Sequence, residues 1–143
     1  MAARGLANVH LPGRVEPQQV PAILAQAQAL LVTLVDDPAM ALTVPSKVQT
    51  YLAAGRPIIA ALAGEGARVV QQAGAGLACA AGSATALVDA VRRLHAMPAA
   101  ERERMGEAGR RYHAEHFSPQ RLTPALVAHL ETAVQAHRSG RRQ

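Results

Sequence analysis

Aromatic residues, cysteine and long apolar runs are nearly absent from this sequence, and each absence excludes a class of protein. The only aromatic residues are Tyr51, Tyr112 and Phe117, too few for the stacking platforms that bind single-stranded nucleic acids. Cys79 is the single cysteine, which excludes an intramolecular disulfide and a thiolate zinc cluster and indicates a small core residue. No apolar run approaches the roughly 20 residues of a membrane-spanning helix.

A secretory signal is also missing from the N-terminal residues. Arg4, Asn8 and His10 stand where a signal peptide has an uninterrupted apolar stretch. The sequence therefore predicts a soluble cytoplasmic protein. Half of its 143 residues are apolar and 17% are charged, which indicates one folded domain rather than a disordered chain.

The net charge of +5 comes from 15 basic residues, of which only Lys47 is a lysine. Most arginines between residues 92 and 111 alternate with glutamates along a helical pattern. Mixed signs of this kind indicate a solvated face with i,i+4 pairs, so no nucleic-acid partner is expected. The basic tail after a partly amphipathic helix leaves a peripheral contact with the inner face of an anionic membrane as a secondary expectation.

Short apolar runs alternate with helical patterns over the first two thirds of the chain. Strands are predicted at 8–11, 29–35, 57–62 and 76–80, and helices at 16–27, 47–54, 67–73, 83–96, about 99–116 and 119–137. This order predicts an α/β fold, a Rossmann-like parallel sheet with flanking helices, followed by an all-helical C-terminal segment. The single domain divides into an α/β part at about 7–97, a helical part at about 98–137 and a basic tail at 138–143.

In such a sheet, ligands bind outside the carboxyl ends of the strands, so the loops that follow strands carry the candidate site. One of these loops leads into a helix at Ser46 and Lys47. A helix start offers unpaired N–H groups and a partial positive charge, which suit a phosphate. Ser46 would add a hydroxyl as the N-cap, and Lys47 a compact ammonium. The alternative is an ordinary capped helix with an exposed lysine.

A second loop places Gly64, Glu65 and Gly66 between a strand and a helix. Glycine allows the backbone to approach a ligand closely, and a carboxylate accepts hydrogen bonds from sugar hydroxyls. The alternative is a flexible turn with an acidic residue near a helix start. The motif is not a dinucleotide fingerprint, because the third glycine and an acidic residue about 20 positions on are missing.

The remaining polar residues indicate no catalytic or metal site. His113 and His116 lack a carboxylate or thiol at metal-ligand spacing, so they are interpreted as surface residues and no metal is expected. The adjacent Asp36 and Asp37 indicate a turn rather than a catalytic pair. Gly-x-Ser-x-Gly does not occur, and no catalytic residue is assigned.

The segment from Pro45 to Ile59, PSKVQTYLAAGRPII, resembles the loop-helix-strand signature of retaining glycosyltransferases of family 4. Within this family, the sequence resembles WbuB-like bacterial enzymes of cell-surface polysaccharide synthesis. Supporting segments follow in the expected order at 8–15, 64–67, 73–77, 105–106 and 112–117, so the resemblance spans nearly the whole chain.

This resemblance implies the GT-B fold, in which two Rossmann-like domains enclose the active site. The C-terminal domain binds the nucleotide-sugar donor, here expected to be a UDP-sugar, and no metal or other cofactor is required. The implied site residues are Ser46, Lys47 and the Val48 amide at the diphosphate, Gly13 and Arg14 at the base or ribose, and Gly64 and Glu65 at the sugar.

Two features depart from the family pattern. The acidic pair that many members carry is replaced by Leu42 and Thr50. The chain also begins at what resembles the third strand of the donor domain, without an acceptor domain before it. In the strand order 3-2-1-4-5-6, segment 8–11 would be separated from the later strands, which exposes sheet edges. We therefore expect a fragment that self-associates or leaves residues 1 to about 27 loosely packed.

The leading interpretation is the donor-binding part of a hexosyl- or N-acetylhexosaminyltransferase, inactive without its acceptor domain. A non-catalytic binding or interaction module, the remnant of such an enzyme, is the alternative. A sugar-nucleotide epimerase is disfavoured because the dinucleotide fingerprint is missing.

Overall fold

The computed structural model describes residues 6–140, with side chains for residues 6–138. In chain order its elements are η2 Pro17–Gln19, α1 Val20–Gln26, β1 Leu30–Thr33, α2 Pro38–Ala41, α3 Ser46–Ala54, β2 Ile58–Ala61, α4 Glu65–Gln72, β3 Gly76–Cys79, α5 Ala84–Ala96, α6 Ala99–His116 and α7 Pro119–Gly140. The predicted α/β alternation followed by helices is confirmed. The short helix α2 is an addition that the sequence pattern did not predict.

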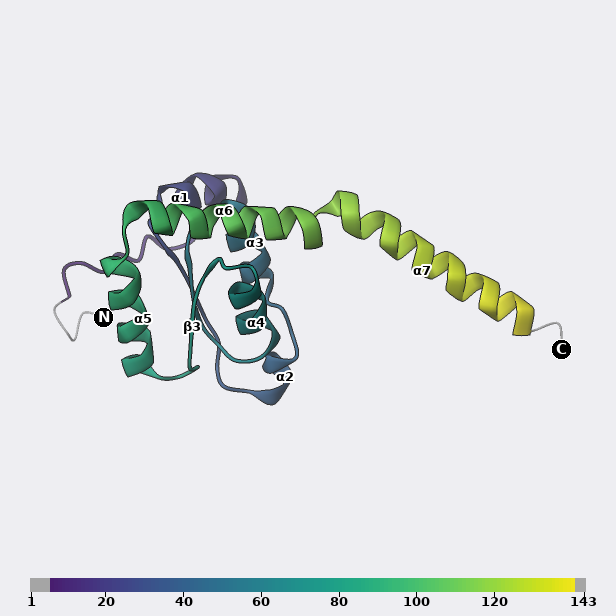
Figure 1. Ribbon diagram of the computed structural model, residues 1–143, viewed down its shortest axis with the longest axis horizontal. Helices are drawn as coiled ribbons and strands as arrows, with labels where there is room; N and C mark the ends of the chain where they lie inside the picture. Colours follow the sequence, from purple (N-terminus) through teal and green to yellow (C-terminus); the bar gives the residue numbers. More distant parts are fainter. Residues whose placement is uncertain (1–5, 141–143) are drawn as a thin grey trace.

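Three parallel strands form the sheet in the order β1-β2-β3. Leu30 pairs with Ile58, which pairs in turn with Gly76 on the other side. Both crossovers advance in the same direction across the sheet, so α3 and α4 cover one face while α5 covers the other (Figure 1). The arrangement is a Rossmann-like α/β fold.

Strand β2 is the centre of the packing because all of its residues are buried. Ile58 belongs to the larger core, under α3 and α4, and Ile59 belongs to the smaller core with Leu94 of α5. Cys79 packs against the smaller core, and burial raises the pKa of its thiol. The prediction that this cysteine is a small core residue is confirmed in part, because Cys79 is half-buried and packs against the core without being one of its buried residues.

One strand prediction is wrong, and a second strand is less buried than expected. Segment 8–11 is not a strand, since it pairs with no strand of the described sheet and residues 6–14 are exposed throughout. Sequence alternation reports local preference, whereas a strand also needs a neighbour for its backbone hydrogen bonds. The apolar run predicted as a strand at 29–35 forms β1, but it is not buried on both faces. Leu31 and Thr33 are exposed, because α5 contacts β2 and β3 and leaves this face of β1 uncovered.

Helix α6 crosses the C-terminal end of α3 at two glycines. A Cβ on Gly106 would lie 2.2 Å from the carbonyl oxygen of Gly55, and one on Gly109 would lie 3.2 Å from the Cβ of Ala75. Gly55 has a φ of 66° and ends α3 in the left-handed conformation. The two backbones are therefore close enough to exclude a side chain at Gly106.

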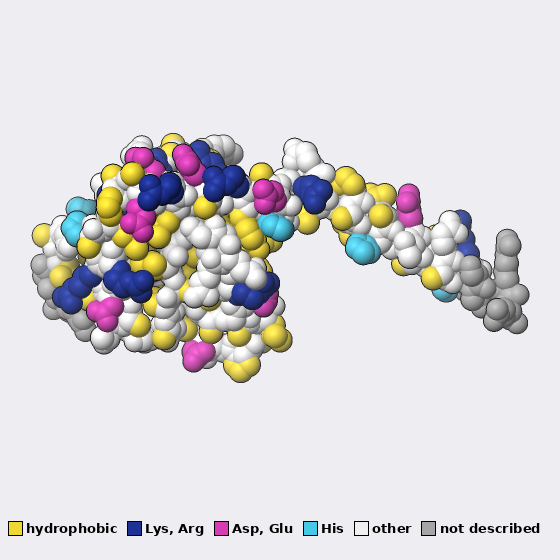
Figure 2. All heavy atoms as spheres, in the orientation of Figure 1, with side chains coloured by type: hydrophobic (Ala, Val, Ile, Leu, Met, Phe, Trp, Pro, Cys, Tyr) yellow, Lys and Arg dark blue, Asp and Glu magenta, His cyan; other side chains and the backbone are white. Residues whose placement is uncertain are grey.

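Helix α7 extends away from the α/β body (Figure 1), and Figure 2 shows apolar side chains along it and mixed charges over α6. The predicted i,i+4 ion pairs of α6 are not formed. Within residues 6–138 the only ion pair joins Glu65 and Arg68, both on α4. None of the helices that the structure describes is both long and apolar enough to cross a membrane.

Alanine at Gly106 is expected to destabilise the fold more than alanine at Gly109. Both substitutions gain about 1 kcal/mol of helix propensity. Only a Cβ on Gly106 would clash with backbone atoms, since the backbone atom nearest to a Cβ on Gly109, the Cα of Leu52, lies at a contact distance of 3.6 Å. Overpacking costs about 1–3 kcal/mol, so Gly106→Ala should lower the free energy of unfolding while Gly109→Ala leaves it near the wild-type value. Urea unfolding measures both variants, and equal effects would contradict the contact.

Candidate functional site

The loop after β1 contains α2, which is capped by Asp37. The Asp37 carboxylate accepts hydrogen bonds from the backbone N–H groups of Ala39 at 2.8 Å and Met40 at 3.1 Å. Pro38 occupies the first helical position, where its missing N–H costs nothing. An aspartate followed by proline is a signal for a helix start, and it could have revealed α2 in the sequence. Asp37 therefore has a structural role in this loop.

Two glycine contacts bring the loops after β1 and β2 together. A Cβ on Gly64 would lie 1.9 Å from the carbonyl oxygen of Ala41, and one on Gly66 would lie 2.9 Å from Cδ of Pro45. Gly64 also has a φ of 72°, which side-chain-bearing residues rarely adopt. These contacts place the start of α4 beside the start of α3, so two of the three predicted groups of site residues lie at one edge of the sheet.

Ser46 is the first residue of α3, so the prediction that it caps the helix is wrong. The N-cap is Pro45, whose side chain cannot accept a hydrogen bond, and Ser46 makes no capping bond. Within the described residues, the backbone N–H groups of Ser46 and Lys47 have no hydrogen-bond partner. The helix start thus presents two amides, a hydroxyl and the exposed ammonium of Lys47.

The Val48 amide differs from its two neighbours. Its N–H donates to the carbonyl oxygen of Pro45 at 2.9 Å, and the Val48 side chain is fully buried. Contact between this amide and a ligand would require that the hydrogen bond be shared or exchanged. The role implied for Val48 stays a prediction with this added condition.

Glu65 is the first residue of α4, and its carboxylate is engaged by Arg68. Nε of Arg68 donates to both carboxylate oxygens at 2.9 Å. This hydrogen bond lowers the pKa of Glu65 and raises that of Arg68. The side chain of Glu65 remains 42% exposed, so part of the carboxylate still faces solvent at the predicted edge.

Gly13 and Arg14 are not brought to this edge. Neither residue hydrogen-bonds to another described residue, and nothing lies within 4 Å of a Cβ built on Gly13. In Figure 1 the segment before η2 runs on the other side of the fold from α2. Their predicted position at the base or ribose stays a prediction.

An open depression of about 620 Å³ lies at the same end of the sheet, between the ends of β1 and β2 and the start of α5. Thr33, Ala61 and Ser83 are among its lining residues. The Ser83 hydroxyl accepts a hydrogen bond from the N–H of Ala86 at 3.2 Å and so caps α5. The depression adds apolar surface to this edge.

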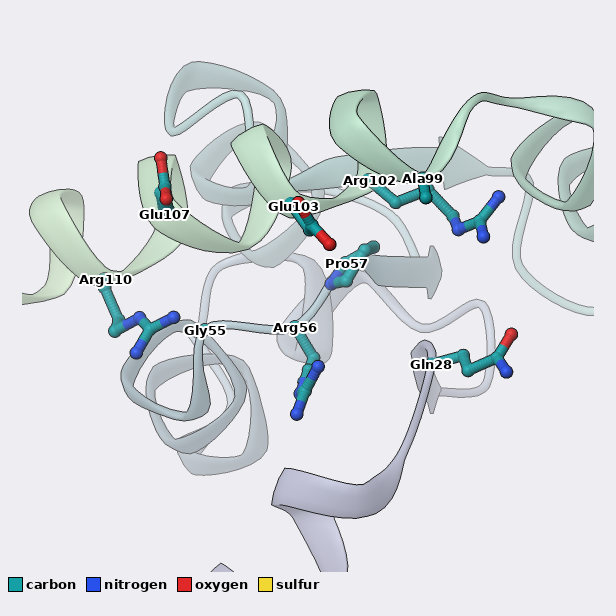
Figure 3. Close-up of a pocket in the computed structure, with 9 residues that line it drawn as sticks. All are labelled: Gln28, Gly55, Arg56, Pro57, Ala99, Arg102, Glu103, Glu107 and Arg110. Carbon is teal, nitrogen blue, oxygen red and sulfur yellow. The ribbon is translucent and has the colours of Figure 1, made fainter.

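A separate cavity of about 250 Å³ lies at the opposite end of the sheet, between the turn at 55–57 and α6 (Figure 3). Its charged side chains point in different directions rather than toward one centre. Arg56 donates to the carbonyl oxygen of Ala25 at the end of α1, and Arg102 donates to that of Met97 after α5. These arginines hold helix ends in place, and the cavity has no convergent set of ligand groups.

The histidines of α6 pack against aromatic rings. The ring centroids of Tyr112 and His116 are 4.2 Å apart, and those of His113 and Phe117 are 6.3 Å apart. Across residues 6–138, no three histidine, cysteine or acidic side chains are placed to hold a metal ion.

The sheet, the free helix start and the adjacent glycine turn define a Rossmann-like protein whose candidate site lies at the carboxyl ends of its strands. The family model of the group 1 glycosyl transferases matches residues 1–97, and the chain belongs to this family. The match contains the starts of α3 and α4 and ends before α6. No curated protein and no solved structure matches the chain.

The Glu65 carboxyl should titrate below the ordinary range of a glutamate, because the hydrogen bond from Arg68 favours its charged form. Since the pKa is lowered in the folded state, the pair stabilises the fold above the unfolded-state pKa, and this stabilisation is lost as the pH falls through the folded-state value. NMR of the carboxyl carbon measures the pKa. Arg68→Gln should return the pKa of Glu65 to the ordinary range, whereas the control Arg92→Gln on α5 should leave this pKa lowered. An ordinary pKa of Glu65 in the wild type would contradict the ion pair.

Proposed function

We propose that the chain is the nucleotide-sugar-binding part of a retaining glycosyltransferase, with the donor diphosphate at the start of α3. The observation that supports this proposal is the pair of unpaired backbone amides of Ser46 and Lys47, beside the exposed Lys47 ammonium. Free N–H groups and the partial positive charge of a helix start stabilise a diphosphate. Membership of the group 1 glycosyl transferases supports the assignment, because these enzymes use nucleotide-sugar donors.

The chemistry of transfer explains why a cation and two amides suit this position. When the sugar leaves the donor, negative charge develops on the departing nucleotide diphosphate. Lys47 and the amides would stabilise that charge from fixed positions, with no metal ion in the proposal. A lysine ammonium is a compact, mobile charge that can follow the diphosphate as it leaves. The only lysine of the sequence, Lys47, stands at this position.

The turn between β2 and α4 suits the sugar of the donor. Gly64 carries no side chain, so a sugar ring can approach its backbone closely. Glu65 can accept hydrogen bonds from sugar hydroxyls through the carboxylate lone pairs that Arg68 leaves free. In this proposal Gly13 and Arg14 reach the base or ribose only if the segment before η2 moves toward α3.

No catalytic or acceptor-binding residue is assigned in the described part of the chain. The one carboxylate in the first turns of α3 and α4 is that of Glu65, which Arg68 engages. We therefore propose that a second domain supplies the acceptor site and that the chain alone transfers little or no sugar. UDP is the nucleotide we expect, in cell-surface polysaccharide synthesis on the cytoplasmic side of the membrane.

A UDP titration followed by amide NMR tests the donor site. UDP should give saturable shifts at residues 45–49 and 64–66, and AMP should not. Lys47→Ala should weaken UDP binding about tenfold or more, the effect of losing a charge-assisted hydrogen bond. Ser46→Ala should weaken binding without changing the free energy of unfolding, because the Ser46 hydroxyl makes no capping bond.

Arg93→Ala on the exposed side of α5 is the matched control for removal of a cation and should leave UDP affinity unchanged. If Lys47→Ala binds UDP as tightly as the wild type, the diphosphate does not lie at α3. If a folded sample shows no UDP shifts at all, the chain is a non-catalytic interaction module instead.

A further inference from the structure

The side chain of Gln72, the last residue of α4, accepts hydrogen bonds from two other residues. Its Oε1 accepts from Nη1 of Arg68 at 2.6 Å and from the hydroxyl of Tyr112 at 3.4 Å. An arginine can only donate, so the amide oxygen rather than the amide nitrogen of Gln72 faces these groups. The same guanidinium donates through Nε to both carboxylate oxygens of Glu65. A chain of hydrogen bonds therefore joins Tyr112 on α6 to Glu65 at the start of α4.

Tyr112 is the anchored end of this chain. Its ring is half-buried and packs against the larger core. The ring centroid also lies 4.2 Å from that of His116 and 6.0 Å from that of Phe117. A tyrosine has only two side-chain torsions, so a packed ring leaves its hydroxyl little freedom of direction. The hydroxyl is thus a fixed point from which Gln72 is held.

The other end of the chain is an exposed ion pair, with 50% of the Arg68 side chain and 42% of the Glu65 side chain accessible. Exposed pairs of this kind are usually mobile and add little to stability. Here a different nitrogen of the same guanidinium is held by Gln72, so the guanidinium is fixed between residues 65 and 72. The Glu65 carboxylate is thereby ordered before any ligand binds. A ligand that bonds to an ordered group does not incur the cost of ordering it.

We propose that Gln72 is a positioning residue for the sugar side of the donor site, with Tyr112 as its support. This inference rests on the proposed function, in which Glu65 accepts hydrogen bonds from sugar hydroxyls. Gln72 itself contacts no substrate; it holds Arg68, and Arg68 holds the carboxylate beside the start of α3. Because Tyr112 lies outside the residues that the family model matches, the helical segment contributes to the site through this chain of hydrogen bonds.

The proposal separates the two parts of the donor. UDP alone binds at the start of α3, which the Gln72 chain of hydrogen bonds does not touch. The sugar binds at Glu65, which this chain orders. A change at Gln72 should therefore reduce the affinity that the sugar adds and leave the affinity for UDP unchanged.

Calorimetric titration with UDP and with UDP-glucose, UDP-galactose, UDP-N-acetylglucosamine and UDP-N-acetylgalactosamine tests this separation. The UDP-sugar that binds most tightly serves for the variants. Gln72→Ala should weaken its binding about twofold, the scale of one exposed side-chain bond on a helix, with UDP binding unchanged. Gln71→Ala is the matched control, because Gln71 is an exposed glutamine of the same helix whose side chain bonds to no described residue.

Two further measurements follow the chain of hydrogen bonds itself. Tyr112→Phe removes only the hydroxyl and should act in the same direction as Gln72→Ala but more weakly, because its bond is the longer one. Tyr51→Phe is its control, since the Tyr51 hydroxyl bonds to no described residue. Without any ligand, NMR of the carboxyl carbon should show the pKa of Glu65 rising toward its ordinary value in Gln72→Ala and not in Gln71→Ala.

The outcomes that contradict the proposal differ from those that contradict the proposed function. Equal weakening of UDP and UDP-sugar binding by Gln72→Ala would make Gln72 a structural residue. UDP shifts at residues 45–49 without tighter binding of any of the four UDP-sugars would overturn the sugar-side role and leave the diphosphate site standing. Absence of UDP binding in a folded sample would overturn the proposed function and this inference with it.

Discussion

Burial of β2 on both faces is the constraint on which the rest of the structure depends. Ile58 packs under α3 and α4, and Ile59 packs under α5, so the two helical layers are held by one strand. The parallel pairing of β1 and β3 with this strand brings all carboxyl ends to the same edge. The loops after β1 and β2 must then turn back over the same face, which is why α3 and α4 begin side by side.

Close contacts at glycines hold α3 at both ends. At its start, Gly66 lies against the ring of Pro45, and at its end Gly106 of α6 lies against the backbone of Gly55. Neither contact leaves room for a Cβ on the glycine, so both ends of the helix are closely packed. A helix start held in this way presents its free amides in a fixed direction, which is the condition for stabilising an anion without reorganisation. The proposed diphosphate site is thus a consequence of how the layers close.

The two ends of the sheet have different roles. At the carboxyl end, the amides of Ser46 and Lys47 are unpaired and the cation is exposed. At the amino end, Arg56 and Arg102 are each bonded to a carbonyl oxygen at a helix end, so their charges serve the packing of α1 and α6. Membership of the family does not say which of these basic residues could bind a ligand. Their hydrogen bonds distinguish them, because a guanidinium that already donates to a backbone carbonyl has fewer free N–H groups for a ligand.

Local pattern by itself determined most of the helices and strands, including the buried run of β2 and the end of α3 at Gly55. It also placed Lys47 and Glu65 at helix starts, since these features depend on residues a few positions apart. Only the tertiary structure decided which of these features have partners. Segment 8–11 has no strand beside it, Leu31 has no helix over it, and the Val48 amide already bonds to Pro45. Strand pairing and burial join residues far apart in the chain, and helix-terminus bonding depends on the path of the loop before it, so local pattern could not predict them.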